Sequence, residues 1–265
     1  MKYLQIFKTT WQNALVYRVN FIMWRARSFL LLLTTYFLWS GVFVSSVQKT
    51  IFNYQSSQII SYLLLVSLLN SVVMSSRTAD LAWIINSGDL SNFLTKPLSI
   101  VKYFFSQDMA DKILNILFLA AELFIFISLF RPVFFWQLDL VLLFSFCFAV
   151  ALAVLLYFLI NFMLGILGFW TNQVWAARFL LMTMIDLLAG NLFPLDILPA
   201  PVFLLFKILP FNLLVYFPAE VYLGRLSLEQ ILGGFGAQAI WMAVFVFFLR
   251  YFWKKGLLRY NAEGR

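Results

Sequence analysis

Long runs of apolar residues, separated by short polar stretches, dominate the chain. Runs of about 17 to 25 apolar residues are long enough to cross the ~30 Å hydrocarbon core of a bilayer as α-helices. They lack the alternation of apolar and polar positions that marks a membrane β-barrel. The pattern therefore predicts an all-α, polytopic membrane protein with six transmembrane helices. The predicted spans cover residues 28–47, 59–76, 113–130, 140–164, 179–195 and 235–251.

Residues 1–27 follow a different pattern, in which apolar side chains recur at steps of three or four and cations occupy the rest of the helix surface. The stretch lacks the uninterrupted apolar core and small-residue cleavage site of a signal peptide. We expect an amphipathic helix that lies on the membrane surface, or one that packs as a soluble cap against a partner. The recurring apolar residues are Leu4, Phe7, Trp11, Leu15, Val19 and Ile22.

Residues 194–224 are apolar enough to resemble a seventh span, but prolines divide them. Each proline removes a backbone donor and disfavours continuous helix, which leaves pieces of about eight residues, or ~12 Å. We expect two short re-entrant helices that enter the outer leaflet and turn back; a single kinked span is the alternative. Five of the seven prolines lie here, at Pro194, Pro199, Pro201, Pro210 and Pro218.

Composition narrows the function classes. With 63% hydrophobic and 11% charged residues, the chain has too few charges to cover a soluble domain. The net charge of +8 does not indicate a nucleic-acid partner, because the cations flank the apolar runs instead of forming a stripe. A single cysteine, Cys147, excludes an intramolecular disulfide, and the absence of histidine excludes Ser-His-Asp and Cys-His catalytic sets.

The cations also predict the orientation. If the N-terminus is cytoplasmic, 15 of the 19 Lys and Arg residues fall on the cytoplasmic side of the six spans. The positive-inside rule therefore places both termini in the cytoplasm. In this topology residues 77–112 form the longest cytoplasmic connection.

That connection contains a polar stretch, INSGDLSNFLTKPLS, which begins at residue 85. Gly88 and Asp89 indicate a turn followed by a helix start, with Asp89 or Ser91 able to cap the free amides. The dipeptide Lys96-Pro97 is expected to end the short helix. Leu90, Phe93 and Leu94 fall on one side of it, so the helix suits either an interfacial anchor or a knob for a groove in a cytoplasmic partner.

Two stretches of the chain resemble one family. NSGDLSNFLTKPLS, residues 86–99, is similar to the cytoplasmic signature of bacterial ABC-2 type exporter permeases, in which a Gly, an acid and a Leu precede Leu-x-[Lys/Arg]-Pro-Leu. FPLDILPAPVFLLFKILPFNLLVYFPAEVYLGR, residues 193–225, resembles the outer segment of the same family, where proline dipeptides punctuate two short helices before the last span. The likeness covers six spans in order and essentially the whole chain.

The resemblance implies a permease subunit of an ATP-binding cassette exporter in the bacterial cytoplasmic membrane. It also implies a second permease subunit, identical or different, and separate ATPase subunits that bind ATP and Mg. Accordingly, the chain has no G-x-x-x-x-G-K-[ST] motif. The resemblance assigns coupling to the ATPase to Gly88, Asp89, Leu90, Leu94, Lys96, Pro97 and Leu98, and we add Phe93 from the apolar side of the same short helix. It assigns an outer gate segment to Pro194, Pro199, Pro210, Pro218 and Glu220.

Two acids lie deep within predicted spans, Glu122 and Asp186. A charge near the bilayer centre costs on the order of 3 kcal/mol, so each is expected to face the bundle or to be protonated. One interpretation is a contact with substrate or protons on the translocation path, which would also suit an ion-coupled secondary transporter. The other is a hydrogen bond that pins neighbouring helices.

The spacing of Asp108 and Asp111 in DMAD is also that of a Mg²⁺-diphosphate site in membrane prenyltransferases. A prenyl-type transferase is thus an alternative function, although those enzymes have two acidic motifs and this chain has one. The simpler interpretation is that acids at the N-terminus of the third span interact with the helix dipole. Gly165 and Gly168 are expected to allow close helix packing.

Overall fold

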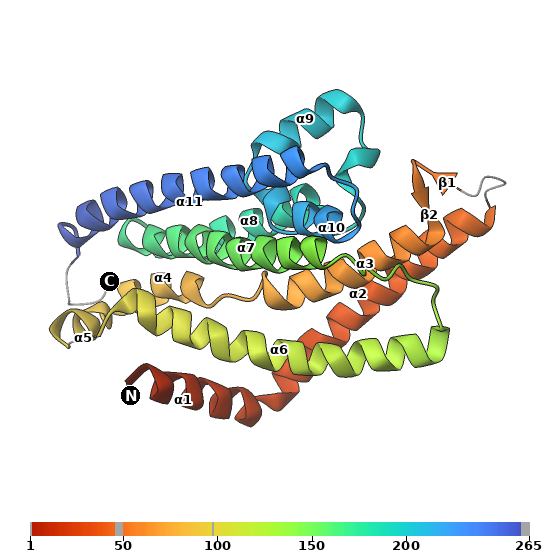
Figure 1. Ribbon diagram of the computed structural model, residues 1–265. Coiled ribbons are helices and arrows are strands. Elements are labelled where there is room, and N and C mark those ends of the chain that lie inside the picture. The colour runs from red at the N-terminus through yellow and green to blue at the C-terminus, as the bar shows by residue number, and fades with distance from the viewer. Residues whose placement is uncertain (1, 46–49, 97, 261–265) are drawn as a thin grey trace.

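The computed structural model describes residues 2–45, 50–96 and 98–260. Within these residues the fold is almost entirely helical, apart from one small β-hairpin, as the apolar pattern predicts. Helices α6, α7 and α11 lie along the length of the molecule, and α2 crosses α6 obliquely (Figure 1). The longer helices are α1 (Lys2–Val16), α2 (Arg18–Ser45), α3 (Ser56–Val72), α6 (Ile100–Phe130), α7 (Leu140–Ile166), α8 (Trp175–Leu188) and α11 (Leu228–Leu257).

Four of the described helices are long and apolar enough to cross a membrane: α2, α6, α7 and α11. The bent pair Ala200–Ile208 and Phe211–Tyr222 makes a fifth candidate if it is one span. Helices α3 and α8 occupy two further predicted spans but have 17 and 14 residues, about 25 and 21 Å at 1.5 Å per residue. The structure therefore supports four or five spans by length, and the six-span topology is not confirmed.

Two helices begin earlier than the apolar pattern predicts. Helix α6 starts at Ile100 instead of residue 113, so the polar connection ends at residue 99 instead of 112. Helix α2 starts at Arg18 instead of residue 28. In α6 the charged residues that suggested a loop lie inside the helix, because groups of residues 75–77 bind them. In α2 the pattern already predicts a helix for residues 1–27, and Arg25 among them pairs with Glu122 on α6, as described below.

The N-terminal helix α1 packs along the first half of α6. Thr10 is buried in this contact, and the Tyr3 hydroxyl accepts a hydrogen bond of 3.2 Å from the Ser99 amide. Leu4 and Leu15, from the predicted apolar face, stay exposed. An exposed apolar side next to a packed side fits the amphipathic pattern, while the position of α1 on the membrane surface stays a prediction.

The short elements gather at the two ends of the bundle (Figure 1). The end that carries the first turn of α1 and the last turn of α11 also carries three short helices: η1 (Thr78–Asp80), α4 (Leu81–Asn86) and α5 (Leu90–Thr95). A further short helix, η2 (Leu167–Phe169), follows α7. The hairpin lies at the opposite end, and the other short helices follow α8. These elements are β1 (Thr50–Ile51), β2 (Tyr54–Gln55), η3 (Leu195–Ile197), α9 (Ala200–Ile208), η4 (Phe211–Leu213) and α10 (Tyr216–Tyr222).

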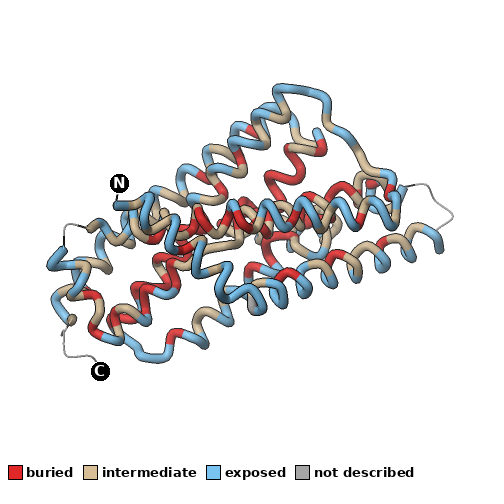
Figure 2. The backbone as a smooth tube through the Cα atoms, turned by 90° about the horizontal axis from the view of Figure 1, so that it is seen from below, coloured by how far each residue is buried: buried red, intermediate tan, exposed pale blue. Residues whose placement is uncertain are grey.

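Buried residues gather along the centre of the bundle, whereas the outer faces of the helices are exposed (Figure 2). On α7 the buried side is formed by Ala149, Ala153, Leu156 and Ile160, which recur at steps of three or four. Small residues on this side allow α10 and α11 to approach α7 closely. The exposed remainder is apolar, as expected for helices whose solvent is lipid.

Candidate functional site

The polar stretch of the sequence forms a corner between two short helices, α4 and α5. Gly88 stands between them with φ at +82°, a left-handed conformation that side chains with a Cβ rarely adopt. The corner turns the chain back so that α5 can begin at Leu90. We call residues Leu81–Thr95 of α4, Gly88 and α5 the α4–α5 corner.

The expected capping of α5 by Asp89 or Ser91 is wrong. Asp89 precedes the helix, but its carboxylate accepts hydrogen bonds from the Ser87 hydroxyl at 2.8 Å and the Asn92 amide nitrogen at 3.4 Å, not from backbone amides. The Ser91 hydroxyl donates to the Gly88 carbonyl at 2.8 Å. Side-chain bonds within the corner thus replace the cap and stiffen the turn.

The three apolar residues of α5 do not share one environment. Leu90 is fully buried, and Phe93 is half-buried with its ring centroid 4.9 Å from that of Tyr103. Leu94 is 52% exposed. Helix α5 ends at Thr95 and Lys96 is extended, as expected before a proline. Leu94 is therefore the apolar side chain that α5 offers to a partner.

The last residues of the predicted coupling motif complete the connection to α6. Lys96 is exposed and Leu98 is half-buried, while Pro97 lies outside the described residues. Ser99 then caps α6, because its hydroxyl accepts a hydrogen bond from the Lys102 amide.

Glycines hold the corner against α7. A Cβ at Gly165 would lie 2.5 Å from the Thr78 carbonyl oxygen, and one at Gly168 would lie 2.7 Å from the Cα of Ala82. Both distances are shorter than real Cβ contacts, so the backbones of η1 and α4 rest directly on the end of α7 and on η2. The prediction that these glycines allow close packing is confirmed.

Tyr260, just beyond α11, holds the same corner from another side. Its hydroxyl donates to the Gly88 carbonyl at 2.5 Å and accepts from the Ser91 amide at 3.0 Å. One side chain thus satisfies two backbone groups on the two sides of the turn. The corner is thereby tied to the end of α11 as well as to α7.

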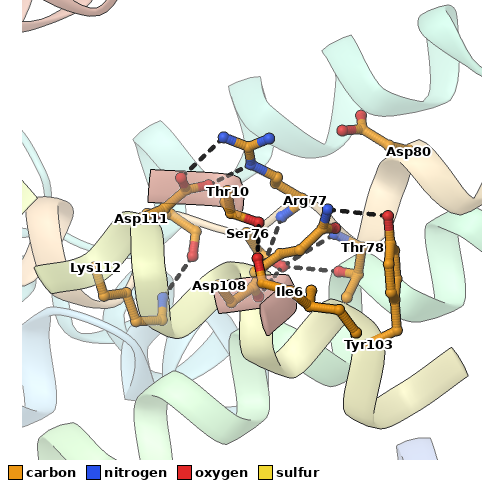
Figure 3. Close-up of polar contacts among 12 residues, drawn as sticks. Ile6, Thr10, Ser76, Arg77, Thr78, Asp80, Tyr103, Asp108, Asp111 and Lys112 are labelled. Carbon is orange, nitrogen blue, oxygen red and sulfur yellow. Dashed lines mark hydrogen bonds and ion pairs between the residues drawn. The ribbon is translucent and has the colours of Figure 1, made fainter. Parts of the chain in front are cut away.

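A cluster of charged residues joins the base of the corner to α6 (Figure 3). Nε and Nη2 of Arg77 donate to the two carboxylate oxygens of Asp111. Asp108 accepts from the Ser76 hydroxyl at 2.6 Å and from the Arg77 amide at 2.8 Å. The Lys112 ammonium donates to the Ser75 carbonyl. We call Ser76, Arg77, Asp108, Asp111 and Lys112 the basal cluster.

The guanidinium of Arg77 stays protonated in this arrangement. Burial lowers the pKa of the guanidinium, but the hydrogen bonds and charge of Asp111, with the charges of Asp80 and Asp108, outweigh it, so the pKa is raised above its usual value. A second pair, Arg178 to Asp80 at 3.2 Å, links α8 to η1. That pair is exposed, and such pairs contribute about 0 to 1 kcal/mol.

The basal cluster corrects the sequence interpretation of DMAD. Asp108 and Asp111 do not lie at a helix N-terminus, since α6 starts at Ile100, and they do not interact with its dipole. Their oxygens accept from Ser76 and Arg77 instead. In residues 2–45, 50–96 and 98–260, no group of three or more His, Cys, Asp or Glu side chains could hold a metal ion.

Glu122 and Asp186 occupy different environments. Arg25 of α2 donates to both carboxylate oxygens of Glu122 on α6, at 2.6 and 2.5 Å, and to the Ser71 hydroxyl on α3 at 2.9 Å. Arg25 is buried, so this ion pair pins three helices and favours the structural interpretation of Glu122. Asp186 is exposed on α8 and accepts a hydrogen bond of 3.2 Å from Asn191, five residues along the same segment.

The prolines of the predicted outer segment stand where a helix tolerates them. Pro194, Pro199 and Pro210 directly precede η3, α9 and η4, and Pro218 lies in the first turn of α10. The chain bends by 79° between Ala200–Ile208 and Phe211–Tyr222. Short helices joined by sharp turns agree with the expected pattern.

Glu220 belongs to a cluster that joins this segment to the β-hairpin. Arg225 donates to Glu220, to Asp196 and to the Asn53 carbonyl at 3.0, 3.0 and 2.9 Å, and its guanidinium lies 3.7 Å from the centroid of the Tyr54 ring. The Tyr54 hydroxyl lies 2.8 Å from both carboxylates. We call Tyr54, Asp196, Glu220 and Arg225 the hairpin cluster.

Tyr54 keeps its proton in this cluster. Burial, together with the negative charges of Glu220 and Asp196, raises the pKa of the Tyr54 hydroxyl far above its usual range. The hydroxyl is therefore a permanent donor between two acceptors. Two carboxylates next to one guanidinium and one phenol make a compact, satisfied network.

Replacing Arg225 by lysine is expected to lower the free energy of unfolding by about 1 to 3 kcal/mol, because a single ammonium cannot reach both carboxylates and the Asn53 carbonyl. Chemical denaturation of the purified protein in detergent measures the change. Arg250→Lys, at an exposed position of α11, is the matched control and should be neutral. Equal stability of the two variants would show that the several hydrogen bonds of the Arg225 guanidinium do not stabilise the fold.

Sequence reasoning missed the residues that pair with the predicted ones: Arg25, Tyr54, Arg77, Asp196, Arg225 and Tyr260. For Arg25 a signal existed, because an arginine and a glutamate that each interrupt an apolar run are natural partners. Tyr54 and Tyr260 left no such signal, since they lie 142 or more residues from their partners, whereas Glu220 and Arg225 are only five residues apart.

Long apolar helices whose outer faces are exposed, with the Arg25–Glu122 pair buried between them, indicate a multi-pass membrane protein. The chain belongs to the ABC-2 family of transporter proteins, because the sequence model of that family matches residues 29–264. It is thus a membrane permease of the ABC-2 type, a transporter component. No curated protein matches the chain.

Proposed function

We propose that this chain is the permease subunit of an ATP-driven exporter and that the α4–α5 corner takes up the movement of a separate ATPase. ATP and Mg are bound by that ATPase, with which permeases of this family generally associate. A second permease subunit, identical or different, completes the path. In this proposal the chain spans the bacterial cytoplasmic membrane six times, with both termini in the cytoplasm.

The observation that carries the proposal is an exposed apolar residue on a rigid corner. Leu94 is 52% exposed at the polar end of the bundle, while the rest of the corner is fixed to α6, α7 and the end of α11. A partner that displaces Leu94 therefore acts on a corner that is attached to three long helices. The proposed coupling region comprises Gly88, Asp89, Leu90, Phe93, Leu94, Lys96, Pro97 and Leu98, of which the exposed members contact the partner.

The attachments of the corner allow it to transmit movement to the spans. A partner shifts the equilibrium between two states of the permease only if it interacts differently with each of them. If the corner moved independently of the bundle, a movement of the ATPase would displace the corner and leave the spans unchanged. Because the glycine contacts with α7 and the basal cluster on α6 leave little freedom, a displacement of α5 reaches the spans.

The opposite end supplies the proposed outer gate. The bent segment with Pro194, Pro199, Pro210 and Pro218 is re-entrant in this proposal, and the ion pair of Glu220 with Arg225 fixes it to the hairpin. The substrate proposed is an amphiphile, such as a lipid, a lipopeptide or an amphiphilic drug, in keeping with the Phe-rich spans. Export is the direction that the family resemblance implies.

Replacing Leu94 by aspartate together with Pro97 by glycine is expected to separate ATP hydrolysis from transport. The first change puts a charge into the apolar contact, and the second frees the end of α5. In proteoliposomes that contain the ATPase, export of a fluorescent lipid analogue should fall at least about fivefold while hydrolysis continues. Leu94→Met, which keeps size and polarity, is the control and should export normally.

Crosslinking tests the contact directly. Cys147 is the sole cysteine, so Leu94→Cys in a Cys147→Ala background places one thiol on the corner. We expect this thiol to crosslink to the co-purifying ATPase, and a cysteine at the exposed position Leu129 at the far end of α6 not to do so. Normal coupling in the Leu94/Pro97 double variant, or export without any nucleotide-hydrolysing companion, would contradict the proposal.

A further inference from the structure

A cavity of about 470 Å³ lies between α1 and the first turns of α6, and its size suits a small ligand. Helix α1 runs beside α6 there, next to the connection from α5 (Figure 1). We call it the α1–α6 cavity. Most of its lining is polar and includes Lys2, Gln5, Thr9, Asn13, Lys96 and Gln107.

Helix α1 presents one polar face to this cavity. Lys2, Gln5, Thr9 and Asn13 recur at steps of three or four, so they lie on one side of the helix over about 16 Å. Within the part of the chain that the structure describes, these four side chains make no hydrogen bond or ion pair. Their polar groups are therefore available to a ligand.

One end of the cavity is cationic. The Ser99 amide donates to the Tyr3 hydroxyl there and so joins the start of α1 to the connection that precedes α6. Lys2 and Lys96 both line this end. The Lys102 ammonium lies near it, 6.0 Å from the centroid of the Tyr3 ring. Because no carboxylate is among the described lining residues, this end suits an anionic group.

The other end of the cavity is neutral. Asn13 lies about three turns along α1 from the cationic end, and Gln107 lies one turn beyond Tyr103 on α6. We call this the amide end, since side-chain amides can both donate to and accept from hydroxyl groups. Ile6 and Leu98 are the aliphatic side chains of the lining, too few to cover an acyl chain.

We propose that the α1–α6 cavity binds a soluble sugar phosphate, with its phosphate held by Lys2 and Lys96 and its hydroxyl groups held by the amide end. A free phosphate ion would leave the amide end unused, and a phospholipid would lack an apolar lining for its chains. The ligand would tie α1 to the coupling region, to which Lys96 belongs. That consequence rests on the proposed function, whereas the binding itself does not.

The test is isothermal titration calorimetry of the intact chain in neutral detergent, without ATPase. Glucose 6-phosphate is the probe, and glucose and inorganic phosphate represent its two halves. Because the probe reaches both ends of the cavity, it should bind at least about tenfold more tightly than either half. Lys2→Gln with Lys96→Gln should weaken binding of the probe at least about tenfold, the effect of losing one or more charge-assisted hydrogen bonds.

A second double variant tests the polar face of α1. Gln5→Leu with Asn13→Leu should weaken the probe about fivefold and leave competition by inorganic phosphate unchanged. The matched control is Lys8→Gln with Lys254→Gln, which removes two exposed lysines that do not line the cavity. This control should bind the probe as the wild type does. Unchanged circular dichroism spectra of all three variants would show that the fold is kept.

Several results would overturn the inference. One is the absence of probe binding by the wild type at millimolar concentration. Another is an equal loss in the lysine control, which would show general charge attraction. Displacement of the probe by phosphatidylglycerol but not by inorganic phosphate would show a lipid headgroup site. Unchanged probe binding with loss of ATPase co-purification in the Lys2/Lys96 variant would assign these lysines to the ATPase. Since binding is measured without ATPase, failure of the coupling proposal leaves it unaffected.

Discussion

Replacing Glu122 by alanine is expected to lower the free energy of unfolding by about 3 to 5 kcal/mol, because Arg25 is left as an uncompensated charge inside the bundle. Arg25 is buried and directs three nitrogens at Glu122 and Ser71, so the loss of Glu122 leaves two of these nitrogens without a partner. Chemical denaturation in detergent measures the loss. Asp186→Ala is the control. It removes an exposed carboxylate that also lies within a predicted span, and it should change the free energy of unfolding by less than about 0.5 kcal/mol.

A second variant separates the ion pair from the packing around it. Arg25→Met combined with Glu122→Leu removes both charges and keeps apolar volume, so it should recover most of the stability that Glu122→Ala loses. If Glu122→Ala were as stable as Asp186→Ala, the pinning role of Glu122 would be wrong. Recovery of stability without recovery of transport would instead assign Glu122 to the translocation path.

Replacing Asp111 by alanine is expected to weaken coupling more than it weakens the fold. The change releases the Arg77 guanidinium from α6 and so loosens the base of the α4–α5 corner, while the Arg77 amide stays bonded to Asp108. The free energy of unfolding should fall by about 1 to 3 kcal/mol, the range for hydrogen bonds to charged groups. Export per ATP hydrolysed should fall at least about fivefold in proteoliposomes with the ATPase.

Two further variants complete this test. Asp80→Ala breaks the exposed pair with Arg178 near the same corner and should have little effect on either quantity. The charge exchange Arg77→Asp with Asp111→Arg should restore part of the coupling, because the pair is re-formed in reverse. Equal coupling in Asp111→Ala and Asp80→Ala would show that the basal cluster does not transmit movement.

The apolar runs were sufficient to predict where most long helices lie, because a bilayer leaves a spanning backbone few alternatives. They failed at the helix starts. Asp108 and Lys112 indicated a loop by composition, but Ser76 and the Ser75 carbonyl satisfy them inside α6. Arg25 is likewise satisfied inside α2 by Glu122. The hydropathy of a segment reflects its charged residues but not the partners that bind them in the fold.

The candidate site was only partly predictable for a similar reason. The turn at Gly88, the end of α5 before Pro97 and the close packing at Gly165 follow from local chemistry, which sequence displays. The division of α5 into a buried Leu90 and an exposed Leu94 depends on what packs against it. Tyr260, 172 residues after Gly88, has no local signal at all.

The hydroxyl of Tyr260 has a practical consequence for how the end of the chain is handled. Because it holds the turn at Gly88 from a position just past α11, shortening the chain after Leu257 removes a support of the α4–α5 corner while all of the last span is kept. In the proposed mechanism, inactivity of such a truncated protein would therefore report on the α4–α5 corner and not on membrane insertion. An affinity tag joined directly after Tyr260 would start next to the α4–α5 corner, so tagged and untagged preparations should be compared for coupling.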